Sequence, residues 1–486
     1  MFTTRPEIKG TFGVVASTHW IASAVGMSML EKGGNAFDAC VAAGLMLQIL
    51  EPQLCGPGGD LPAIFHSTRT GKTQVLCAQG VAPAGATIAH FRGKLGLDLV
   101  PGSGFLATVV PGVFAGYMAL LADHGSLEVE DVLGPAIHYA RHGHPVLPRV
   151  CQTIADIAPF FEKYWPSSAA TWLPGGKPPV PDSLFRNPVL ADTYERILKE
   201  AKAAKGGREA RVEAARRAYM QGFVAEAIER FATGAELMDS SGRANRGVIT
   251  AHDMASWQPS YEAPLAYDYG NWTLCKTGPW GQGPVLAQTL SILKGFDLAN
   301  MEPAGADFIH TVAEAMKLAF ADREVYYGDP KFSIVPMEKL LDEAYAAGRR
   351  RLVTERASRE LRPGLLPGFE EQVAKTFAML AKGGGQASSL LTREPTMAHL
   401  LPGSQRGNAP VTPLAARSAR RGDTVHIDVI DRHGNMISAT PSGGWLQSSP
   451  VIPGLGFCLN TRGQMFWLDE GLPSSLEPGK RPRTTL

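Results

Sequence analysis

Hydrophobic residues near the start of the chain alternate between the spacing of strands and that of helices. Phe12 to Ala16 is a short β-branched run, and Ile21 to Glu31 carries apolar residues at helical intervals before Gly33-Gly34. Asn35 then has the side chain of a helix N-cap, with Asp38 three residues on to complete a capping box. This stretch therefore predicts a strand followed by two helices.

The second of these helices is apolar on almost every side as far as Leu50, which predicts a position inside a layered core. Gly56 to Gly59 ends the helical pattern, and Leu61 to Ser67 predicts a strand. Further along, Trp272 to Lys276 predicts a strand and Ala306 to Tyr326 an amphipathic helix. Because the two kinds of element alternate without a strict βαβ rhythm, the pattern favours an α+β or layered architecture.

Residues 383–421 are rich in Gly, Ser, Pro and Arg and follow neither period, which predicts a long flexible linker. A structureless stretch of that length inside a compact protein is usually functional or disordered. The residues that follow it are therefore candidates for chemistry.

A half-buried strand is predicted directly after this linker. One face of residues 424–431 is apolar, with Val425, Ile427 and Val429. Gly434 marks a turn, and Met436 to Thr440 predicts the returning strand. With the turn centred on His433, the numbers of facing residues sum to 866, so Thr424 faces Ser442 (424 + 442). Facing side chains lie about 5 Å apart. By itself this pattern favours an ordinary edge strand.

A threonine in this position also permits a specific reaction. Cleavage of the peptide bond after Asp423 would free an α-amine on Thr424, and such an amine titrates near 7.7–8.0, roughly at neutral pH. It could then act as the general base for the hydroxyl of the same residue. Before cleavage, that hydroxyl could attack the Asp423 carbonyl and form an ester that water hydrolyses.

Composition narrows the class of protein. The 486 residues carry 47 Lys and Arg against 46 Asp and Glu, so a formal net charge of +1 gives no electrostatic case for nucleic acid or an anionic membrane. The N-terminus lacks the apolar core of a signal peptide, and the longest apolar run, Ala39 to Leu50, is too short to span a bilayer. Six widely separated cysteines indicate buried free thiols and a cytoplasmic protein.

Three other motifs carry weaker signals. Gly71-Lys72-Thr73 resembles the end of a P-loop, but its flanks predict a hairpin. Ser291 and Lys294 with Lys276-Thr277-Gly278 match two motifs of serine β-lactamases. The two motifs occur here in reversed order, and Ser291 lies inside a predicted helix. His142 and His144 lack a carboxylate or cysteine partner, so we expect neither a metal nor a cofactor.

Several stretches together resemble the gamma-glutamyltransferase family. They are GMSMLEKGGNAFDACVAAGLMLQILEPQLCGPGG, AEAMKLAFADREVYYGDP, DTVHIDVIDRHGNMIS and PGKRPRTTL, in that order along nearly the whole chain. The resemblance implies an N-terminal-nucleophile (Ntn) hydrolase with a four-layer αββα sandwich. It also implies a proenzyme cut before Thr424 into a large subunit, residues 1–423, and a small subunit, residues 424–486.

The resemblance gives roles to particular residues of this chain. Thr424 becomes the catalytic nucleophile, and the bond between Asp423 and Thr424 becomes the self-cleavage point. A second catalytic-site threonine of the family falls on Ser442, which keeps the hydroxyl, and a pair of substrate-binding serines falls on Thr484 and Thr485.

Other positions depart from the family and change the expected substrate. The arginine that grips the glutamyl α-carboxylate falls on Ile88, and the Gln and Asp that hold the α-amino group fall on Arg462 and Met465. Without the acid, a substrate ammonium has no counter-charge, whereas Arg462 could bind a carboxylate bidentately. We therefore expect a small amide with a carboxylate and no α-amine, as in the oxamate-amidohydrolase-like branch. A surface salt bridge is the alternative role for Arg462.

Two alternative functions stay open. One is true gamma-glutamyl transfer or glutathione hydrolysis. The other is a catalytically inactive relative that serves as a binding or scaffold protein, because the sequence stops at Leu486, before the Gly-Gly turn that supplies oxyanion donors in the family. On this view the C-terminal part of the sandwich is missing.

Overall fold

The computed structural model describes residues 7–382 and 424–485, so Asp423, Leu486 and the predicted linker at 383–421 lie outside the described residues. The chain divides into two compact units. Among the described residues, unit 1 comprises 7–86, 101–262 and 424–464, and unit 2 comprises 87–100, 263–382 and 465–485. These compact units differ from the large and small subunits expected from the sequence, which are defined by cleavage of the 423–424 peptide bond. The two subunits stay a prediction.

A six-stranded antiparallel sheet is the centre of unit 1, in the order β1-β11-β12-β2-β3-β8. Its strands are β1 (Gly13–Ser17), β2 (Leu61–Ser67), β3 (Lys72–Ala78), β8 (Ser260–Glu262), β11 (Ile427–Asp431) and β12 (Met436–Ala439). The hairpin β11–β12 therefore lies inside the sheet, between β1 from the N-terminus and β2. Two short ladders complete the strands of this unit: β4 (His144–Pro145) with β5 (Leu184–Phe185), and β6 (Leu237–Met238) with β7 (Ala244–Asn245).

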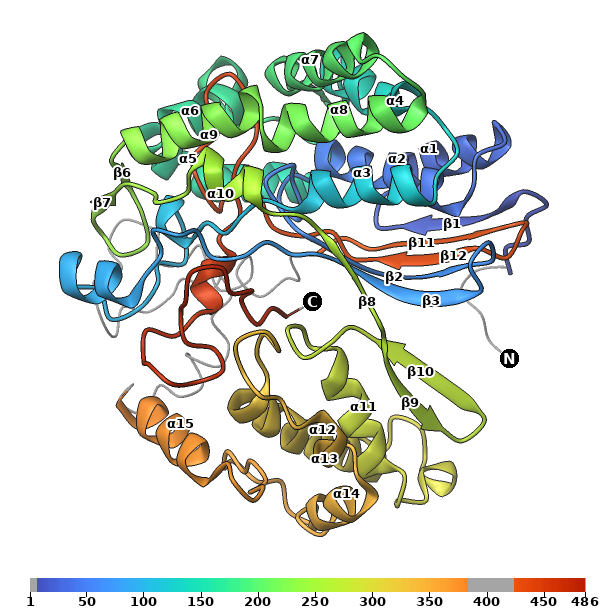
Figure 1. The fold of residues 1–486 in the computed structure, drawn as a ribbon, viewed down its shortest axis with the longest axis vertical. Helices are drawn as coiled ribbons and strands as arrows, with labels where there is room; N and C mark the ends of the chain where they lie inside the picture. Colours follow the sequence, from blue (N-terminus) through green and yellow to red (C-terminus); the bar gives the residue numbers. More distant parts are fainter. Residues whose placement is uncertain (1–6, 383–423, 486) are drawn as a thin grey trace. The chain divides into compact units, whose positions relative to one another are not determined.

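Helices cover one face of this sheet in two layers (Figure 1). Helices α1, α2 and α3 pack on the strands, α4 and α8 pack on those helices, and α7 packs on α4 and α8. The helices of unit 1 are α1 (Trp20–Glu31), α2 (Ala36–Leu50), α3 (Val113–Asp123), α4 (Val129–His142), α5 (Pro148–Tyr164), α6 (Pro166–Trp172), α7 (Pro188–Ala203), α8 (Arg208–Met220), α9 (Phe223–Gly234) and α10 (Ala251–Ser256).

Helix α2 occupies the core that its sequence predicted, because all its residues are buried. Asn35 and Asp38 form the expected capping box at its start. Gly44 allows α3 to approach closely, since a Cβ at this position would lie 2.1 Å from the Tyr117 hydroxyl oxygen. The helix thereby becomes a fixed platform beneath β11 and β12.

Unit 2 is mainly helical. Its elements are β9 (Leu265–Tyr269), β10 (Trp272–Lys276), α11 (Gly283–Leu293), α12 (Ala306–Tyr326), α13 (Met337–Leu340), α14 (Glu343–Arg350) and α15 (Glu370–Lys382). Strands β9 and β10 form a two-stranded antiparallel hairpin, and α11 packs on both the hairpin and α12. The strand at 272–276 and the helix at 306–326 agree with the sequence prediction.

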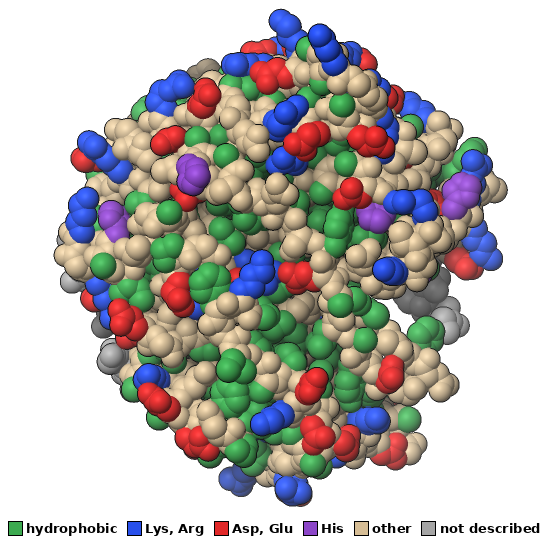
Figure 2. All heavy atoms as spheres, in the orientation of Figure 1, with side chains coloured by type: hydrophobic (Ala, Val, Ile, Leu, Met, Phe, Trp, Pro, Cys, Tyr) green, Lys and Arg blue, Asp and Glu red, His purple; other side chains and the backbone are tan. Residues whose placement is uncertain are grey.

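The α+β class is confirmed. Of the four layers that the family resemblance implies, the described part of unit 1 supplies one sheet and the helices on one of its faces. Within residues 7–382 and 424–485, none of the helices combines the length and hydropathy that a membrane crossing requires. Figure 2 shows side chains of both charges interspersed over the face in view, as the net charge of +1 leads one to expect.

Candidate active site

The hairpin of β11 and β12 has the register that its alternating pattern predicted. Ile427 pairs with Ala439 and Val429 with Ile437, so the paired numbers sum to 866. The turn closes through the Asp431 carboxylate, which accepts hydrogen bonds from the backbone N–H groups of His433 and Asn435. Ile427 and Val429 of β11 are buried, which fixes the register, because a slip by one residue would expose both of them.

Thr424 and Ser442 meet at the end of this hairpin. They form an antiparallel bridge, and their hydroxyl oxygens lie 3.5 Å apart, at the outer limit of a hydrogen bond. The Ser442 side chain is buried, whereas Thr424 is partly exposed. The pairing expected from the sequence is confirmed, although the strand itself begins at Ile427 and not at Thr424. The bridge places two hydroxyls together three residues before β11.

Ser442 is also held from its other side. The Asp60 N–H donates to the Ser442 carbonyl at 2.8 Å, and the Ser442 N–H donates to the Asp60 carbonyl at 3.1 Å. Asp60 immediately precedes β2, and Thr440 donates in the same way to the Pro62 carbonyl. Ser442 is therefore the middle residue of a row whose outer members are Thr424 and Asp60.

Arg462 forms a buried ion pair with Asp60. Its Nε donates to Asp60 Oδ2 at 2.9 Å and its Nη2 to Oδ1 at 3.2 Å, while the two side chains are only 1% and 0% exposed. The guanidinium also lies 5.4 Å from the centre of the Trp445 ring. The surface salt bridge considered from sequence is wrong, because this pair is buried. The role in binding a substrate carboxylate stays a prediction, although a carboxylate of the protein already occupies the fork.

A glycine turn separates Ser442 from Trp445. Gly443 and Gly444 both have positive φ, 74° and 67°. A Cβ at Gly444 would lie 2.8 Å from the Gly59 backbone nitrogen, so a residue with a side chain would not fit this conformation. The turn therefore needs glycine, and it lacks side chains that could hold it in place.

Thr484 and Thr485 belong to unit 2, whereas Thr424, Ser442 and Arg462 belong to unit 1. Thr484 is buried, and its N–H donates to the Trp280 carbonyl at 3.0 Å. That the five residues form one substrate site stays a prediction.

Two ion pairs fix the segment before these threonines, and the sequence reasoning missed both. Arg481 Nη2 donates to Asp329 Oδ1 at 2.8 Å, and Arg483 Nη2 donates to Glu324 Oε2 at 2.6 Å. Burial lowers the pKa of Arg483 to about 10, although Glu324 raises it. Both acids lie in the stretch AEAMKLAFADREVYYGDP that carries part of the resemblance.

The rival motifs occupy unsuitable places. Gly71 forms the turn of the β2–β3 hairpin with a φ of 65°, so Gly71-Lys72-Thr73 does not lead from a strand into a helix. Ser291 is buried inside α11. Among the described residues there is no group of three or more His, Cys, Asp or Glu side chains arranged to hold a metal.

One Ser–His–Asp cluster does occur, on the exposed face of the sheet. His426 Nε2 lies 3.1 Å from Asp428 Oδ1 and 3.2 Å from Ser438 Oγ. A catalytic triad requires the acid and the hydroxyl on different ring nitrogens, whereas Asp428 and Ser438 share Nε2 here. The other nitrogen, Nδ1, lies 3.0 Å from Thr440 Oγ1. The cluster therefore does not activate Ser438.

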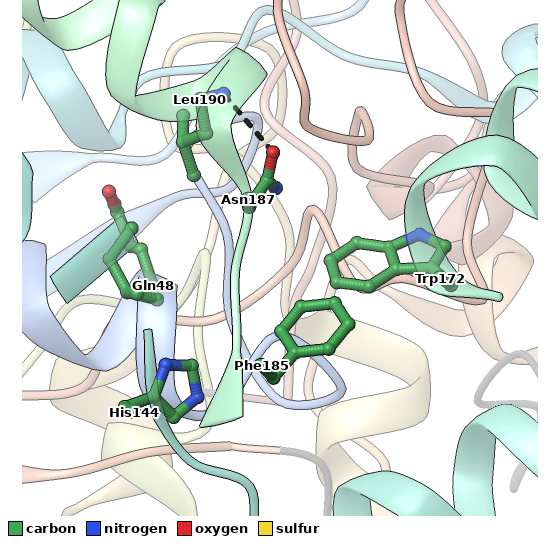
Figure 3. Close-up of a pocket in the computed structure, with 7 residues that line it drawn as sticks. Gln48, His144, Trp172, Phe185, Asn187 and Leu190 are labelled. Atoms are coloured by element: carbon green, nitrogen blue, oxygen red, sulfur yellow. Dashed lines mark hydrogen bonds between the residues drawn. The ribbon is translucent and has the colours of Figure 1, made fainter. Parts of the chain in front are cut away.

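A small cavity lies elsewhere in unit 1 and contains none of the predicted site residues (Figure 3). Its walls come from α2, β4, α6, β5 and α7, and are formed by Gln48, Ile49, His144, Trp172, Phe185, Asn187 and Leu190. His144 is buried here, and its Nδ1 has no hydrogen-bond partner. Burial, aided by the nearby His19, lowers the pKa of His144 to about 4.

This histidine makes stability depend on pH. Between about pH 4 and 6.5 the unfolded chain binds a proton at residue 144 and the folded chain does not, so unfolding becomes easier as the pH falls. A shift of this size corresponds to about 3 kcal/mol. We expect His144→Phe to flatten the decline in urea-unfolding free energy over this range, while His252→Gln, at an exposed position, leaves it unchanged. An equally steep decline in His144→Phe would contradict this assignment.

The chain is similar to known proteins over nearly its whole length. The gamma-glutamyltranspeptidase family model matches residues 22–486. The chain is 29% identical over 482 residues to the glutathione hydrolase-like YwrD proenzyme of Bacillus subtilis (strain 168), covering 99% of this chain and 76% of that protein. It is 30% identical over 493 residues to the acylase ACY 1 proenzyme of Pseudomonas sp. (strain SE83), covering 99% and 74%. A solved structure of a threonine-to-alanine variant of LmbA2991 superposes with a TM-score of 0.85 at 48% identity, covering 100% of this chain and 77% of that one.

Proposed function

Because the chain belongs to the gamma-glutamyltranspeptidase family, we propose that it is a self-processing amide hydrolase with Thr424 as its nucleophile. One observation carries this proposal: Thr424 lies just before strand β11 of an internal hairpin, where it forms a bridge with Ser442, and the two hydroxyl oxygens lie 3.5 Å apart. The relatives named as proenzymes support the self-processing step.

Self-processing begins with the Thr424 hydroxyl. Its oxygen attacks the Asp423 carbonyl carbon, the bond from that carbon to the Thr424 nitrogen breaks, and the nitrogen takes the hydroxyl proton. Water then hydrolyses the resulting ester, which gives an Asp423 carboxylate and a Thr424 that carries a free hydroxyl and a free α-amine. The product contains its own general base.

Turnover uses the same hydroxyl. The α-amine removes its proton as the oxygen attacks the substrate amide, and the proton passes to the departing nitrogen. The acyl group remains on Thr424 as an ester until water, activated by the same amine, releases it as a carboxylate. Ser442 orients the hydroxyl, since its own hydroxyl oxygen lies 3.5 Å away and its backbone is held by two hydrogen bonds to Asp60.

The substrate that we propose is a small amide with a carboxylate and no α-amine, such as oxamate. The family's ammonium-binding acid is Met465 in this chain, and the buried carboxylate of Asp60 is already paired with Arg462. A substrate ammonium would therefore lack a counter-charge beside these residues, which is costly in a desolvated site. Thr484 and Thr485 are the hydroxyls that we assign to substrate positioning.

Substrate profiling tests this choice. We expect kcat/KM for oxamate to exceed that for glutathione by at least about tenfold, because an unpaired ammonium weakens binding in the transition state. Ammonia release and glutamate release, measured on the same self-cleaved preparation, give the two values. A preference for glutathione would favour gamma-glutamyl transfer or glutathione hydrolysis, the second of which is the activity that the name of some relatives gives. Ile88→Arg serves as a companion variant. If glutathione turnover appears only when this arginine is present, gamma-glutamyl transfer is excluded for the natural chain.

A cytoplasmic location is part of the proposal. Five cysteines, Cys40, Cys55, Cys151, Cys275 and Cys458, form no disulfide, and Cys275 alone among these five is not fully buried. Unpaired cysteines are typical of a reducing compartment.

A further inference from the structure

We propose that Asp60 and Arg462 are positioning residues that hold Ser442 in register with Thr424, and that Arg462 acts through Asp60 and Trp445 without touching substrate. This inference rests on the proposed function, and it gives Arg462 a different role from the carboxylate binding that the sequence predicted. It concerns residues of unit 1 alone.

The first step is the geometry of Ser442. Its backbone exchanges two hydrogen bonds with Asp60, and its hydroxyl faces Thr424. Any movement of the segment at Asp60 therefore shifts the hydroxyl that orients the nucleophile. The contacts that hold Asp60 in place therefore also hold Ser442 in place.

The second step is the position of the guanidinium. Arg462 forms two hydrogen bonds with the Asp60 carboxylate and stacks on Trp445, whose Nε1 donates to the Leu54 carbonyl at 2.7 Å. It thus contacts the partner of Ser442 and the residue three places after Ser442. The Gly443–Gly444 turn lies between Ser442 and Trp445. Arg462 therefore restrains the turn at its start, through Asp60, and at its end, through Trp445.

The third step is the anchoring of Arg462 itself. Its N–H donates to Asn460 Oδ1 at 3.2 Å, and Asn460 Nδ2 donates to the carbonyls of Gly58 and Val109 at 2.9 and 3.0 Å. Three chain segments far apart in sequence are thereby locked together at the end of the sheet that carries Thr424. A rigid frame of this kind is what a nucleophile requires, since small displacements of reacting groups lower rates steeply.

Burial supports a positioning role over a purely stabilising one. A fully buried ion pair contributes little net stability, because desolvation offsets the attraction, whereas its geometry is specific. The planar fork of arginine fixes both carboxylate oxygens, which a lysine cannot do. The Arg462–Asp60 pair therefore contributes more to the orientation of Asp60 than to the stability of the fold.

The test uses Arg462→Lys, which keeps the charge and loses the fork, together with the double variant Asp60→Asn/Arg462→Gln, which removes both charges and leaves no unpaired buried ion. We expect each to lower the rate of self-cleavage and the kcat for both oxamate and uncharged oxamide by about tenfold, with KM changed less than about twofold. The thermal midpoint of the double variant is expected to stay close to that of the natural chain. Arg196→Lys, which alters the exposed pair with Glu200, is the matched control and is expected to behave as the natural chain does.

Contact between Arg462 and a substrate carboxylate would give a different pattern. KM for oxamate would rise, oxamide would be unaffected, and self-cleavage would proceed at its natural rate, which overturns the positioning role. Self-cleavage at the natural rate in the double variant would overturn it as well. These outcomes leave the Thr424 mechanism intact, whereas a natural chain that never cleaves would overturn the mechanism and the positioning role together.

Discussion

Thr424→Ala is expected to leave the chain as one polypeptide of 486 residues and to lower amide hydrolysis by about 10⁴-fold or more. The natural chain should instead give fragments of 423 and 63 residues (486 − 423), the second with the N-terminal sequence TVHIDV. The effect is large because one hydroxyl performs both the self-cleavage and the attack on substrate, and its removal also prevents the α-amine from being freed. Intact-mass measurement and amide hydrolysis on the same samples report the two losses separately.

Two further variants make this experiment decisive. Thr424→Ser keeps a hydroxyl and should still cleave, more slowly, whereas Ser442→Ala keeps the nucleophile and should reduce both rates without abolishing either. An active natural chain with its 423–424 bond intact would exclude the mechanism. A natural chain that is both intact and inactive would favour the scaffold role that the sequence left open.

Asp38→Ala is expected to destabilise the fold by about 3–5 kcal/mol, since it leaves several buried donors without an acceptor. The Asp38 carboxylate accepts hydrogen bonds from the N–H groups of Asn35, Ser126 and Leu127 and from the Ser126 hydroxyl, all at 2.8–3.1 Å. It joins the start of α2 to the loop before α4. Urea unfolding monitored by circular dichroism would measure the loss.

Ser126→Ala is the matched control, because it removes only the hydroxyl bond and leaves the backbone donors satisfied. We expect it to cost about 1 kcal/mol. Equal losses in the two variants would show that the carboxylate does not join these segments. A loss below about 1 kcal/mol in Asp38→Ala would contradict the role of this acid as a structural hub.

Local patterns predicted the elements that carry the candidate site. The alternation in residues 424–431 and the turn at Gly434 were enough to set the hairpin register, and hence the meeting of Thr424 with Ser442. Half of the role of Asp38 was predictable in the same way, because a capping box spans only three residues. Its bonds to Ser126 and Leu127 were not, since a contact across 88 or 89 positions leaves no periodic trace.

Long-range ion pairs account for most of what the sequence did not predict. Arg462 and Asp60 are 402 positions apart, and neither lies in a pattern that identifies the other. The sequence indicated that Arg462 would bind a carboxylate, but it could not indicate that the carboxylate belongs to the protein. Composition offered no help either, because charged residues are usually exposed and this pair is buried.

The position of the β11–β12 hairpin has a consequence for the cleaved protein. Strand β11 is bonded to β1 along its length, β12 is bonded to β2, and the Asp431 carboxylate also accepts from the Ala36 N–H at the start of α2. Breaking the 423–424 bond would alter which residues are covalently joined while every one of these hydrogen bonds persists. The short fragment would then be as firmly integrated as any other strand, and the two polypeptides should co-purify and separate only when unit 1 unfolds.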